Sequence, residues 1–144
     1  MTDPALRRLQ TLPSWLLGRA AALGHRLVAD HLAEVELRLS HHAVLCAVAE
    51  YQPVAQAELA RTVKIDPKDM VTVLNDLQAR DLVTRTRDPK DARRNLITLS
   101  PGGCELLHRT EALGEQANAE LVAPLSPAER EQLNDLLRRI IADR

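Results

Sequence analysis

The stretch QAELARTVKIDPKDMVTVLNDLQARDLVTRTRDPKDARRNLIT, from Gln56 to Thr98, decides the fold of this 144-residue chain. Its opening residues predict a short helix over Gln56–Val63, followed by a tight turn. Asp66 then stands in the N-cap position and Pro67 at the first helical position, which together signal a strong helix start. We therefore expect a second helix that runs to Arg80.

This second helix has two distinct faces. Its apolar residues recur with helical spacing, which predicts one buried face made of Met70, Val73, Leu74 and Leu77. The other face carries Lys68, Val71, Thr72 and Asn75. Hydrogen-bonding and methyl-bearing side chains of this kind read base edges and thymine methyl groups in the major groove of DNA. A solvated polar face is the alternative, and the neighbouring elements favour the DNA-reading interpretation.

A two-stranded β-ribbon is expected after the second helix. Leu82–Arg87 and Asn95–Leu99 alternate and are rich in β-branched residues, and DPKDARR joins them as a loop. Asp91 is expected to support this loop by accepting hydrogen bonds from the nearby backbone or from an arginine two residues on. The ribbon's basic residues are Arg85, Arg87, Lys90, Arg93 and Arg94. An arginine at such a tip can enter a minor groove while its neighbours hold phosphates.

The distribution of charge along the chain fits a nucleic-acid partner better than the net charge of the whole chain does. The net charge is −1, but between Arg61 and Arg94 nine Lys and Arg stand against six Asp, a local charge of +3. Attraction to phosphate decays over a Debye length of about 10 Å, so the local charge matters more than the total. Charge alone is equally compatible with a mixed, solvated surface.

The chain before this stretch predicts two helices. Leucine and alanine recur at helical spacing from residue 12 to 37, which indicates one long helix with a wide apolar surface. Ser40 is expected to cap the next helix, which reaches about Glu50 and is apolar nearly all round, and so buried. His41 lies in its first turn, where free N–H groups favour a nearby phosphate; a simply exposed helix start is the alternative.

The end of the chain predicts two more helices and a reason for self-association. Ser100-Pro101 starts a helix that reaches about Leu121, and SPAE from Ser126 is a capping box that opens the last one. The last helix carries a continuous apolar stripe of Leu133, Leu136, Leu137, Ile140 and Ile141. The middle of the chain has its own core, so this stripe and the long first helix need another surface to bury. A two-fold dimer supplies that surface.

The sequence resembles the winged helix-turn-helix of MarR-type (multiple antibiotic resistance regulator) transcriptional regulators. The resemblance is carried by the order LARTVKIDPKDMVTVLNDLQARDLVTRTRDPKDARRNLITLSPGG. The most specific part is the wing motif D-P-x-D-x-R-R, here residues 88–94. It is followed by L-T-L-S-x-x-G, here Leu96 to Gly102, which read L-I-T-L-S-P-G in this chain. Asp81 stands where the family usually has Gly, and Asp tolerates left-handed backbone better than most residues.

The resemblance implies a mainly α (α+β) fold in a single domain over residues 1–144, with a winged helix-turn-helix lobe at 40–100 and dimerisation helices at 12–37 and 101–144. It implies a homodimeric repressor that binds double-stranded DNA at a palindromic operator, with Arg93 in the minor groove. It also suggests a pocket for a small-molecule effector, often an aromatic acid or phenol. Candidate lining residues are Trp15, Arg19 and His25, each of which is also explained as a structural or solvated residue.

Other readings of the residues stay open. A protein-interaction module that keeps the winged fold without reading DNA fits the near-neutral total charge. A redox-responsive regulator needs an exposed thiolate near positive charge, for which Cys104 is the better candidate and Cys46, in the apolar helix, the poorer. A metal-responsive regulator would need His42 and His108 to meet in the fold; because no ligand cluster has clear spacing, no metal site is expected.

Several classes are excluded by what the sequence lacks. No Gly-rich phosphate loop or nucleophile motif is present, so we expect neither an enzyme nor a cofactor. No apolar run approaches the roughly 18 residues of a membrane span, and MTDPALRRLQ lacks the apolar core of a signal peptide. We therefore expect a cytoplasmic protein. One Trp, one Tyr and no Phe argue against a platform for single-stranded nucleic acid.

Overall fold

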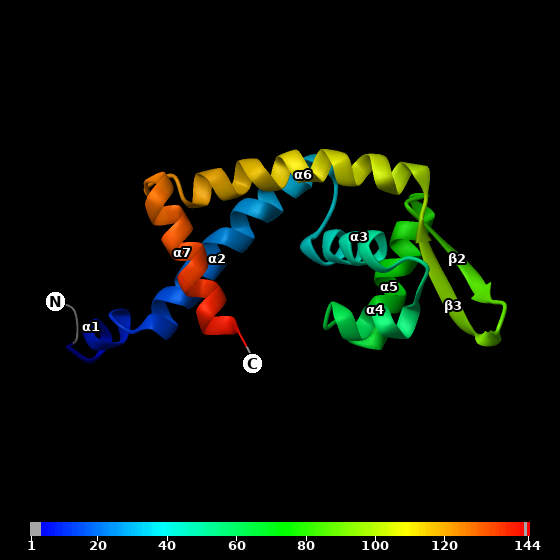
Figure 1. Cartoon of the computed structure of the whole chain (residues 1–144), viewed down its shortest axis with the longest axis horizontal. Helices are drawn as coiled ribbons and strands as arrows, with labels where there is room; N and C mark the ends of the chain where they lie inside the picture. The colour runs from blue at the N-terminus through cyan, green and yellow to red at the C-terminus, as the bar shows by residue number, and fades with distance from the viewer. Residues whose placement is uncertain (1–3, 143) are drawn as a thin grey trace.

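The chain folds into a lobe of helices and a small sheet, carried by a set of long helices that we call the arm (Figure 1). The computed structural model describes residues 4–142 and 144. Residues 1–3 and 143, which belong to the expected domain 1–144, lie outside the described residues. In the part of the chain that is described, no helix is long and apolar enough to cross a membrane.

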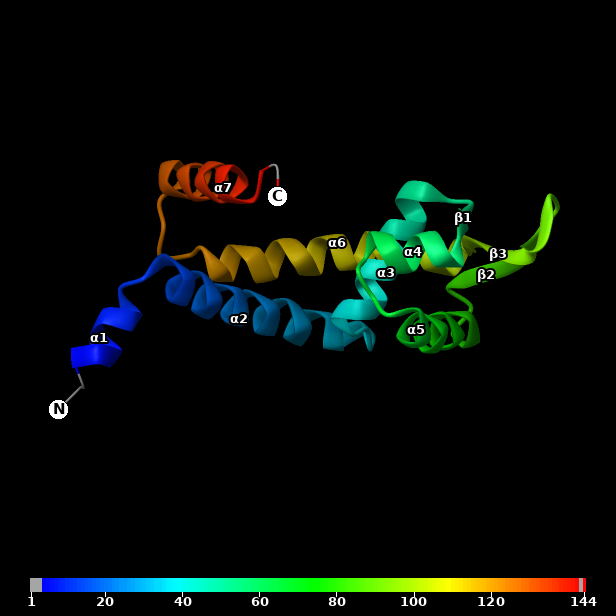
Figure 2. The ribbon, with the colours of Figure 1, turned by 90° about the horizontal axis from the view of Figure 1, so that it is seen from below.

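The arm consists of four helices from the two ends of the chain. α2 (Pro13–Leu32) and α6 (Pro101–Leu121) pack side by side, as the two views agree (Figure 2). α1 (Pro4–Gln10), which was not predicted, precedes them, and α7 (Pro127–Ile141) follows. The capping box of α7 is confirmed: the Glu129 amide donates to Ser126 Oγ over 3.2 Å and the Ser126 amide to Glu129 Oε1 over 2.8 Å. Neither α1 nor α7 buries a residue within the chain.

The junction between arm and lobe corrects the expected helix at 12–37. α2 ends at Leu32, and the 3₁₀ helix η1 (Ala33–Val35) leads to Glu36, which has a left-handed φ of 56°. The turn has a physical reason, since Leu32, Val35 and Leu37 are all buried in the core of the lobe. The end of the arm is thereby anchored inside the lobe.

The lobe is a winged helix, as the fold expected from the sequence requires. Its helices are α3 (Leu39–Tyr51), α4 (Gln56–Thr62) and α5 (Pro67–Ala79). Its antiparallel sheet has the order β1-β3-β2, with β1 (Val54–Ala55), β2 (Val83–Asp88) and β3 (Asp91–Leu99). Val54 pairs with Ile97 and Val83 with Leu99. β1, which was not predicted, ties the start of α4 to the ribbon.

The predicted cap of α3 is wrong. The helix begins at Leu39, and the residue in the N-cap position is Arg38, whose backbone is extended with φ −90° and ψ 161°. Ser40 therefore lies inside the first turn, where its hydroxyl cannot cap the helix; its Oγ lies 3.4 Å from His41 Nδ1.

The core of the lobe joins all its elements around α5. The predicted apolar face is confirmed, because Met70, Leu74 and Leu77 are 0% exposed and Val73 is 6% exposed. Residues from the end of α2, from α3, α4 and from the sheet complete the same cluster. The opposite face of α5 is held toward solvent by this burial.

Close packing of α6 on the lobe gives a first testable prediction. A Cβ added at Gly103 would lie 2.2 Å from the backbone oxygen of Leu82, whereas one added at Gly114 in the same helix meets nothing within 4 Å. Gly103→Ala is expected to lower the free energy of unfolding by about 2 kcal/mol. Gly114→Ala is expected to raise it by about 0.5–1 kcal/mol, because alanine favours helix. Urea unfolding followed by circular dichroism measures both; equal stability of the two variants would contradict the packing.

Candidate nucleic-acid interface

The α5 helix begins at the residues that the sequence indicates. The Asp66 carboxylate accepts a hydrogen bond of 2.9 Å from the Lys68 amide, and Pro67 occupies the first helical position. The turn before it is closed by Lys64, which has a left-handed φ of 56°. The residues expected to read DNA, Lys68, Val71, Thr72 and Asn75, are all exposed along one side of α5. The helix thus presents these four exposed side chains on one outward face.

The loop predicted between the two strands is wrong. β2 and β3 continue pairing to Asp88 opposite Asp91, with a register irregularity between Arg87 and Asp88, so only Pro89-Lys90 turn the chain. The Asp88 carboxylate accepts a 2.9 Å hydrogen bond from the Lys90 amide, which lets a very short turn close. Arg93 and Arg94 consequently lie on a strand rather than in the predicted loop.

Arg93 projects from the wing and is held by Asp91. Its side chain is 92% exposed, while Asp91 Oδ1 accepts from the Arg93 amide over 3.1 Å and from its Nε over 3.2 Å. These hydrogen bonds hold the pKa of Asp91 below its ordinary value, so the carboxylate stays charged at neutral pH. The expected supporting contact of Asp91 is present. It orients the arginine and leaves most of the guanidinium in solvent.

Arg94 turns away from Arg93 and onto the lobe. Its guanidinium pairs with Glu58 of α4 over 3.0 Å and lies 4.0 Å from the Asp88 carboxylate. The side chain remains 46% exposed. Arg94 therefore connects the wing to α4.

Two further residues that were predicted to contact DNA, Arg85 and Asn75, bind each other. Arg85 on β2 donates through Nε to Gln78 Oε1 over 2.9 Å and through its other end to the side-chain oxygen of Asn75. The amide nitrogen of Asn75 is not used by this contact. The pair ties the wing to α5. Arg87 and Lys90 are exposed farther along the wing.

His41 lies beneath α5 rather than projecting from the helix start. Its Nε2 is 3.1 Å from the Asp76 carboxylate, and its side chain is only 11% exposed. The predicted phosphate contact would therefore involve a histidine that is already paired with an acid of α5.

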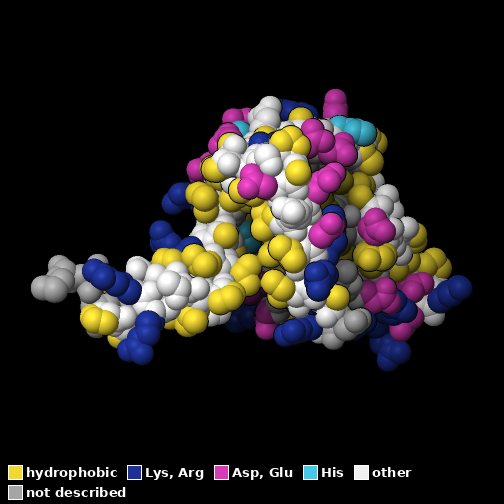
Figure 3. Space-filling model, turned by 60° about the vertical axis from the view of Figure 1, so that its left-hand side comes forward, with side chains coloured by type: hydrophobic (Ala, Val, Ile, Leu, Met, Phe, Trp, Pro, Cys, Tyr) yellow, Lys and Arg dark blue, Asp and Glu magenta, His cyan; other side chains and the backbone are white. Residues whose placement is uncertain are grey.

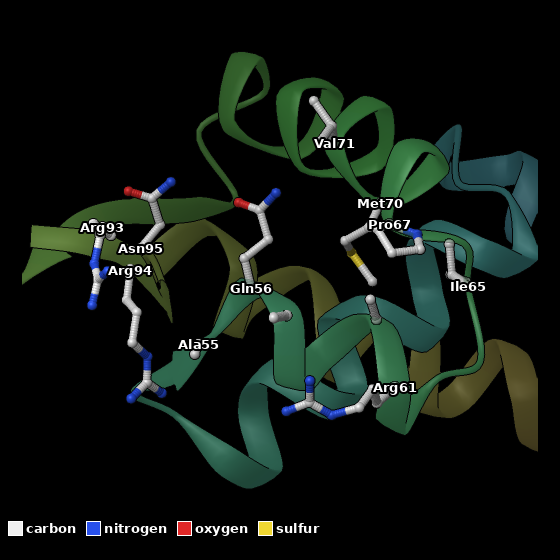
Figure 4. A pocket seen from close by; sticks show the side chains of 12 residues that line it. Ala55, Gln56, Arg61, Ile65, Pro67, Met70, Val71, Arg93, Arg94 and Asn95 are labelled. Atoms are coloured by element: carbon white, nitrogen blue, oxygen red, sulfur yellow. The ribbon is translucent and has the colours of Figure 1, made fainter. Parts of the chain in front are cut away.

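A groove of about 460 Å³ runs between α4, the start of α5 and β3 (Figure 4). Its floor is apolar, with Ala60, Ile65 and Met70, and Arg61, Arg93 and Arg94 line its sides. Arg61 was not among the predicted site residues. No local signal identifies it, since its place beside the wing follows only from the packing of α4. The groove places three arginines along a channel next to the exposed face of α5.

The candidate effector residues lie on the arm. The Arg19 guanidinium is 5.6 Å from the centre of the Trp15 ring, a cation–π contact on α2. His25 is exposed farther along the same helix. None of the three lines the groove beside α5 or the cavity described next.

A cavity of about 540 Å³ lies beside the contact between α3 and α6, at the junction of lobe and arm. It brings His42 and His108 to one place, together with both cysteines, and Cys46 is exposed there rather than buried in the core. His42 Nε2 lies 3.1 Å from Thr110 Oγ1 and 3.5 Å from Cys46 Sγ. Partial burial of the two side chains lowers the pKa of His42 and raises that of the Cys46 thiol, which favours the neutral form of both groups. Across residues 4–142 and 144, no three His, Cys, Asp or Glu side chains are placed to hold a metal ion.

Comparison with known proteins agrees with this architecture. A family model described as MarR family matches residues 36–94, which include α5 and most of the wing. A probable transcriptional regulator from Pseudomonas aeruginosa, known from its crystal structure, is 33% identical, with a TM-score of 0.80 over 92% of this chain and 99% of that one. The chain belongs to the MarR family. Members of this family are DNA-binding transcription factors and not enzymes.

Two characterised relatives show what related MarR-family proteins do. The transcriptional repressor NicR of Pseudomonas putida is 31% identical over 67% of this chain, which spans only 61% of NicR. BpsR of Bordetella bronchiseptica is 27% identical, with a TM-score of 0.80 over 94% of this chain and 96% of BpsR, and its DNA binding is regulated by 6-hydroxynicotinic acid.

Proposed function

We propose that this MarR-family protein is a homodimeric transcriptional repressor that binds a palindromic operator and is released by a small-molecule effector. One observation carries the proposal: the exposed face of α5 lies beside a wing whose Arg93 is 92% exposed and held by Asp91. A helix face and an oriented arginine side by side suit two adjacent grooves of one duplex.

In this proposal the two elements have different tasks. The outward face of α5, with Lys68, Val71, Thr72 and Asn75, reads bases in the major groove. Arg93 enters the neighbouring minor groove, where the negative potential is concentrated. Arg61, Arg87 and Lys90 hold phosphates along the intervening backbone. Arg85 and Arg94, which bind Asn75 and Glu58, set the position of the wing.

The dimer is proposed from the arm. Large apolar side chains stay exposed there, with Leu16 at 50%, Leu136 at 53% and Ile141 at 69%. Figure 3 shows hydrophobic side chains gathered along the projecting N-terminal end and on the face beside it. A second copy covers this surface most simply, because both ends of the chain are apolar in each copy. Two-fold symmetry then places the recognition helices about 34 Å apart, one turn of DNA.

The effector site is proposed at the cavity between α3 and α6. A ligand there would contact the lobe and the arm at once, so it would favour one angle between them. BpsR, whose regulator is an aromatic acid, supports the same ligand class for this chain. Trp15, Arg19 and His25, the ligand-binding candidates from the sequence, lie on α2 and do not line this cavity.

A salt titration tests the DNA-binding proposal and distinguishes it from a protein-interaction module. A random-sequence duplex library is first used to select the preferred site. Binding to the selected duplex is then measured by fluorescence anisotropy between about 50 and 200 mM KCl. Over this range, six or more phosphate contacts give about a 10³-fold loss of affinity. A selection that recovers no duplex, or a DNA affinity that does not fall with salt, would contradict binding through phosphate contacts. The protein-interaction module would then be the better explanation of the fold.

A further inference from the structure

Arg80 connects the end of the recognition helix to the end of the arm. It occupies the C-cap position of α5, and its guanidinium donates to the backbone oxygens of Glu36 over 2.7 Å and Val35 over 3.0 Å. These two carbonyls belong to the turn that ends α2 and η1. One side chain therefore binds two successive carbonyls that lie 44 and 45 residues earlier in the sequence.

Such carbonyls are suitable partners for a cation. The last carbonyls of a helix have no partner within it and carry the negative end of the helix dipole. The left-handed backbone of Glu36 turns the chain sharply at this point. A planar guanidinium can bind two neighbouring oxygens, whereas a lysine ammonium acts as a single point of charge. Arg80 of α5 thus caps the 3₁₀ helix η1, which ends the arm.

The surroundings make this contact important for the angle of the junction. A hollow of about 340 Å³, lined by Glu36, Arg38, His41, Asp76, Ala79 and Arg80, lies on this side of the junction. Polar contacts span it in place of packed side chains, namely those of Arg80 and the pair between His41 and Asp76. On the other side, Leu32, Val35 and Leu37 anchor the arm in the core. The apolar anchors hold the junction together, and Arg80 restrains its rotation.

We propose that Arg80 is a positioning residue that fixes the angle between arm and recognition helix, and so sets the half-site spacing that the dimer accepts. This inference rests on the proposed dimeric, DNA-binding function. It concerns geometry and not affinity for a single half-site, since Arg80 is engaged with Val35 and Glu36 at the end of α5 that leads away from Lys68.

A small change of the junction angle is enough to displace the far end of α5 by about one base pair. α5 has 13 residues and is therefore about 20 Å long at about 1.5 Å per residue. A rotation of about 10° moves the far end of a helix of this length by about 3.5 Å, close to the rise of one base pair, about 3.4 Å. A loosened junction thus lets each recognition helix reach a neighbouring register on the DNA.

Selection from a duplex library with a random central region of 40 base pairs tests the inference. Four proteins are each checked for folding and dimer mass and then used for selection: the wild type, Arg80→Ala, Arg80→Lys and a control on the arm, Arg109→Ala. We expect the wild type and Arg109→Ala to recover half-sites at one spacing. Arg80→Ala is expected to recover the same half-site sequence at several neighbouring spacings. Arg80→Lys is expected to give a narrower spread, because its ammonium keeps the charge but lacks the rigid planar fork that holds both carbonyls in fixed positions.

Affinity measurements give the second readout. Inserting one base pair between the half-sites is expected to weaken wild-type binding at least about tenfold more than Arg80→Ala binding, because the insertion displaces and rotates one half-site. A folded Arg80→Ala dimer that keeps one spacing, or that recovers no site, overturns the inference; Arg80→Lys decides in the same way if the alanine variant unfolds. A wild type that recovers no paired half-sites overturns the proposed function itself.

Discussion

Replacing Arg93 by alanine is expected to weaken operator binding about 30- to 1,000-fold. Each wing would lose a guanidinium worth about 1–2 kcal/mol, and a dimer would lose two of them. The side chain is 92% exposed, and among the described residues its hydrogen bonds are made to Asp91, so its removal should leave the fold intact. Fluorescence anisotropy on the selected duplex measures the loss, with the melting temperature as the check on folding.

Two companion variants sharpen this result. Arg93→Lys keeps the charge without the planar guanidinium and should fall between wild type and alanine. Arg109→Ala removes an exposed arginine of α6 on the arm and should bind as the wild type does. Unchanged affinity in Arg93→Ala would remove the wing from the proposed DNA-binding face.

Replacing Leu136 by glutamate is expected to produce a folded monomer. Leu136 is 53% exposed on α7, and the proposed dimer buries it against the partner's arm, where an unpaired carboxylate is strongly unfavourable. A monomer keeps only one half-site contact, so operator affinity should fall on the order of 100-fold or more. Sedimentation equilibrium gives the mass, and anisotropy on the same duplex gives the affinity.

The matched control lies on the same helix. Asp135 lies on the side of α7 opposite the middle of its apolar stripe and is exposed, so Asp135→Lys should remain dimeric. A Leu136→Glu protein with the wild-type mass and affinity would show that α7 does not form the interface, and the dimer would need another surface.

Local signals explain why much of the fold could be predicted from the sequence. The start of α5 depends on Asp66 and Pro67, and that of α7 on Ser126 and Glu129, which act within one helical turn. The buried face of α5 follows from spacing alone. Asp81 is confirmed in the left-handed backbone, with φ 56°. Each of these features needs only neighbouring residues.

Features that depend on distant contacts were not predictable in this way. β1 is two residues long and exists because Val54 and Ala55 pair with β3, some forty residues later. α2 ends at Leu32 because the residues after it turn into the lobe. The wing was expected to have a loop over 88–94, but pairing of Asp88 with Asp91 carries the strands almost to the tip.

The candidate site also combines features that neighbouring residues predict with features that depend on distant contacts. The exposed face of α5 and the contact between Asp91 and Arg93 follow from spacing of a few residues. The partners of Arg94 and Arg80 lie 36 and 44 residues away, so no local pattern distinguishes these arginines from Arg93. Sequence therefore predicted which residues are basic, and the fold determines which of them project and which of them connect elements.

Hydroxyl-radical footprinting of the wild-type protein on the selected duplex tests the central proposal most directly. A dimer with two recognition helices and two wings should protect two patches on one face of the DNA, with centres about 34 Å, or one helical turn, apart. Protection should weaken beside each patch in Arg93→Ala, where the wing is expected to enter the minor groove. A single patch, or uniform protection along the duplex, would contradict a two-fold dimer that reads a palindromic operator.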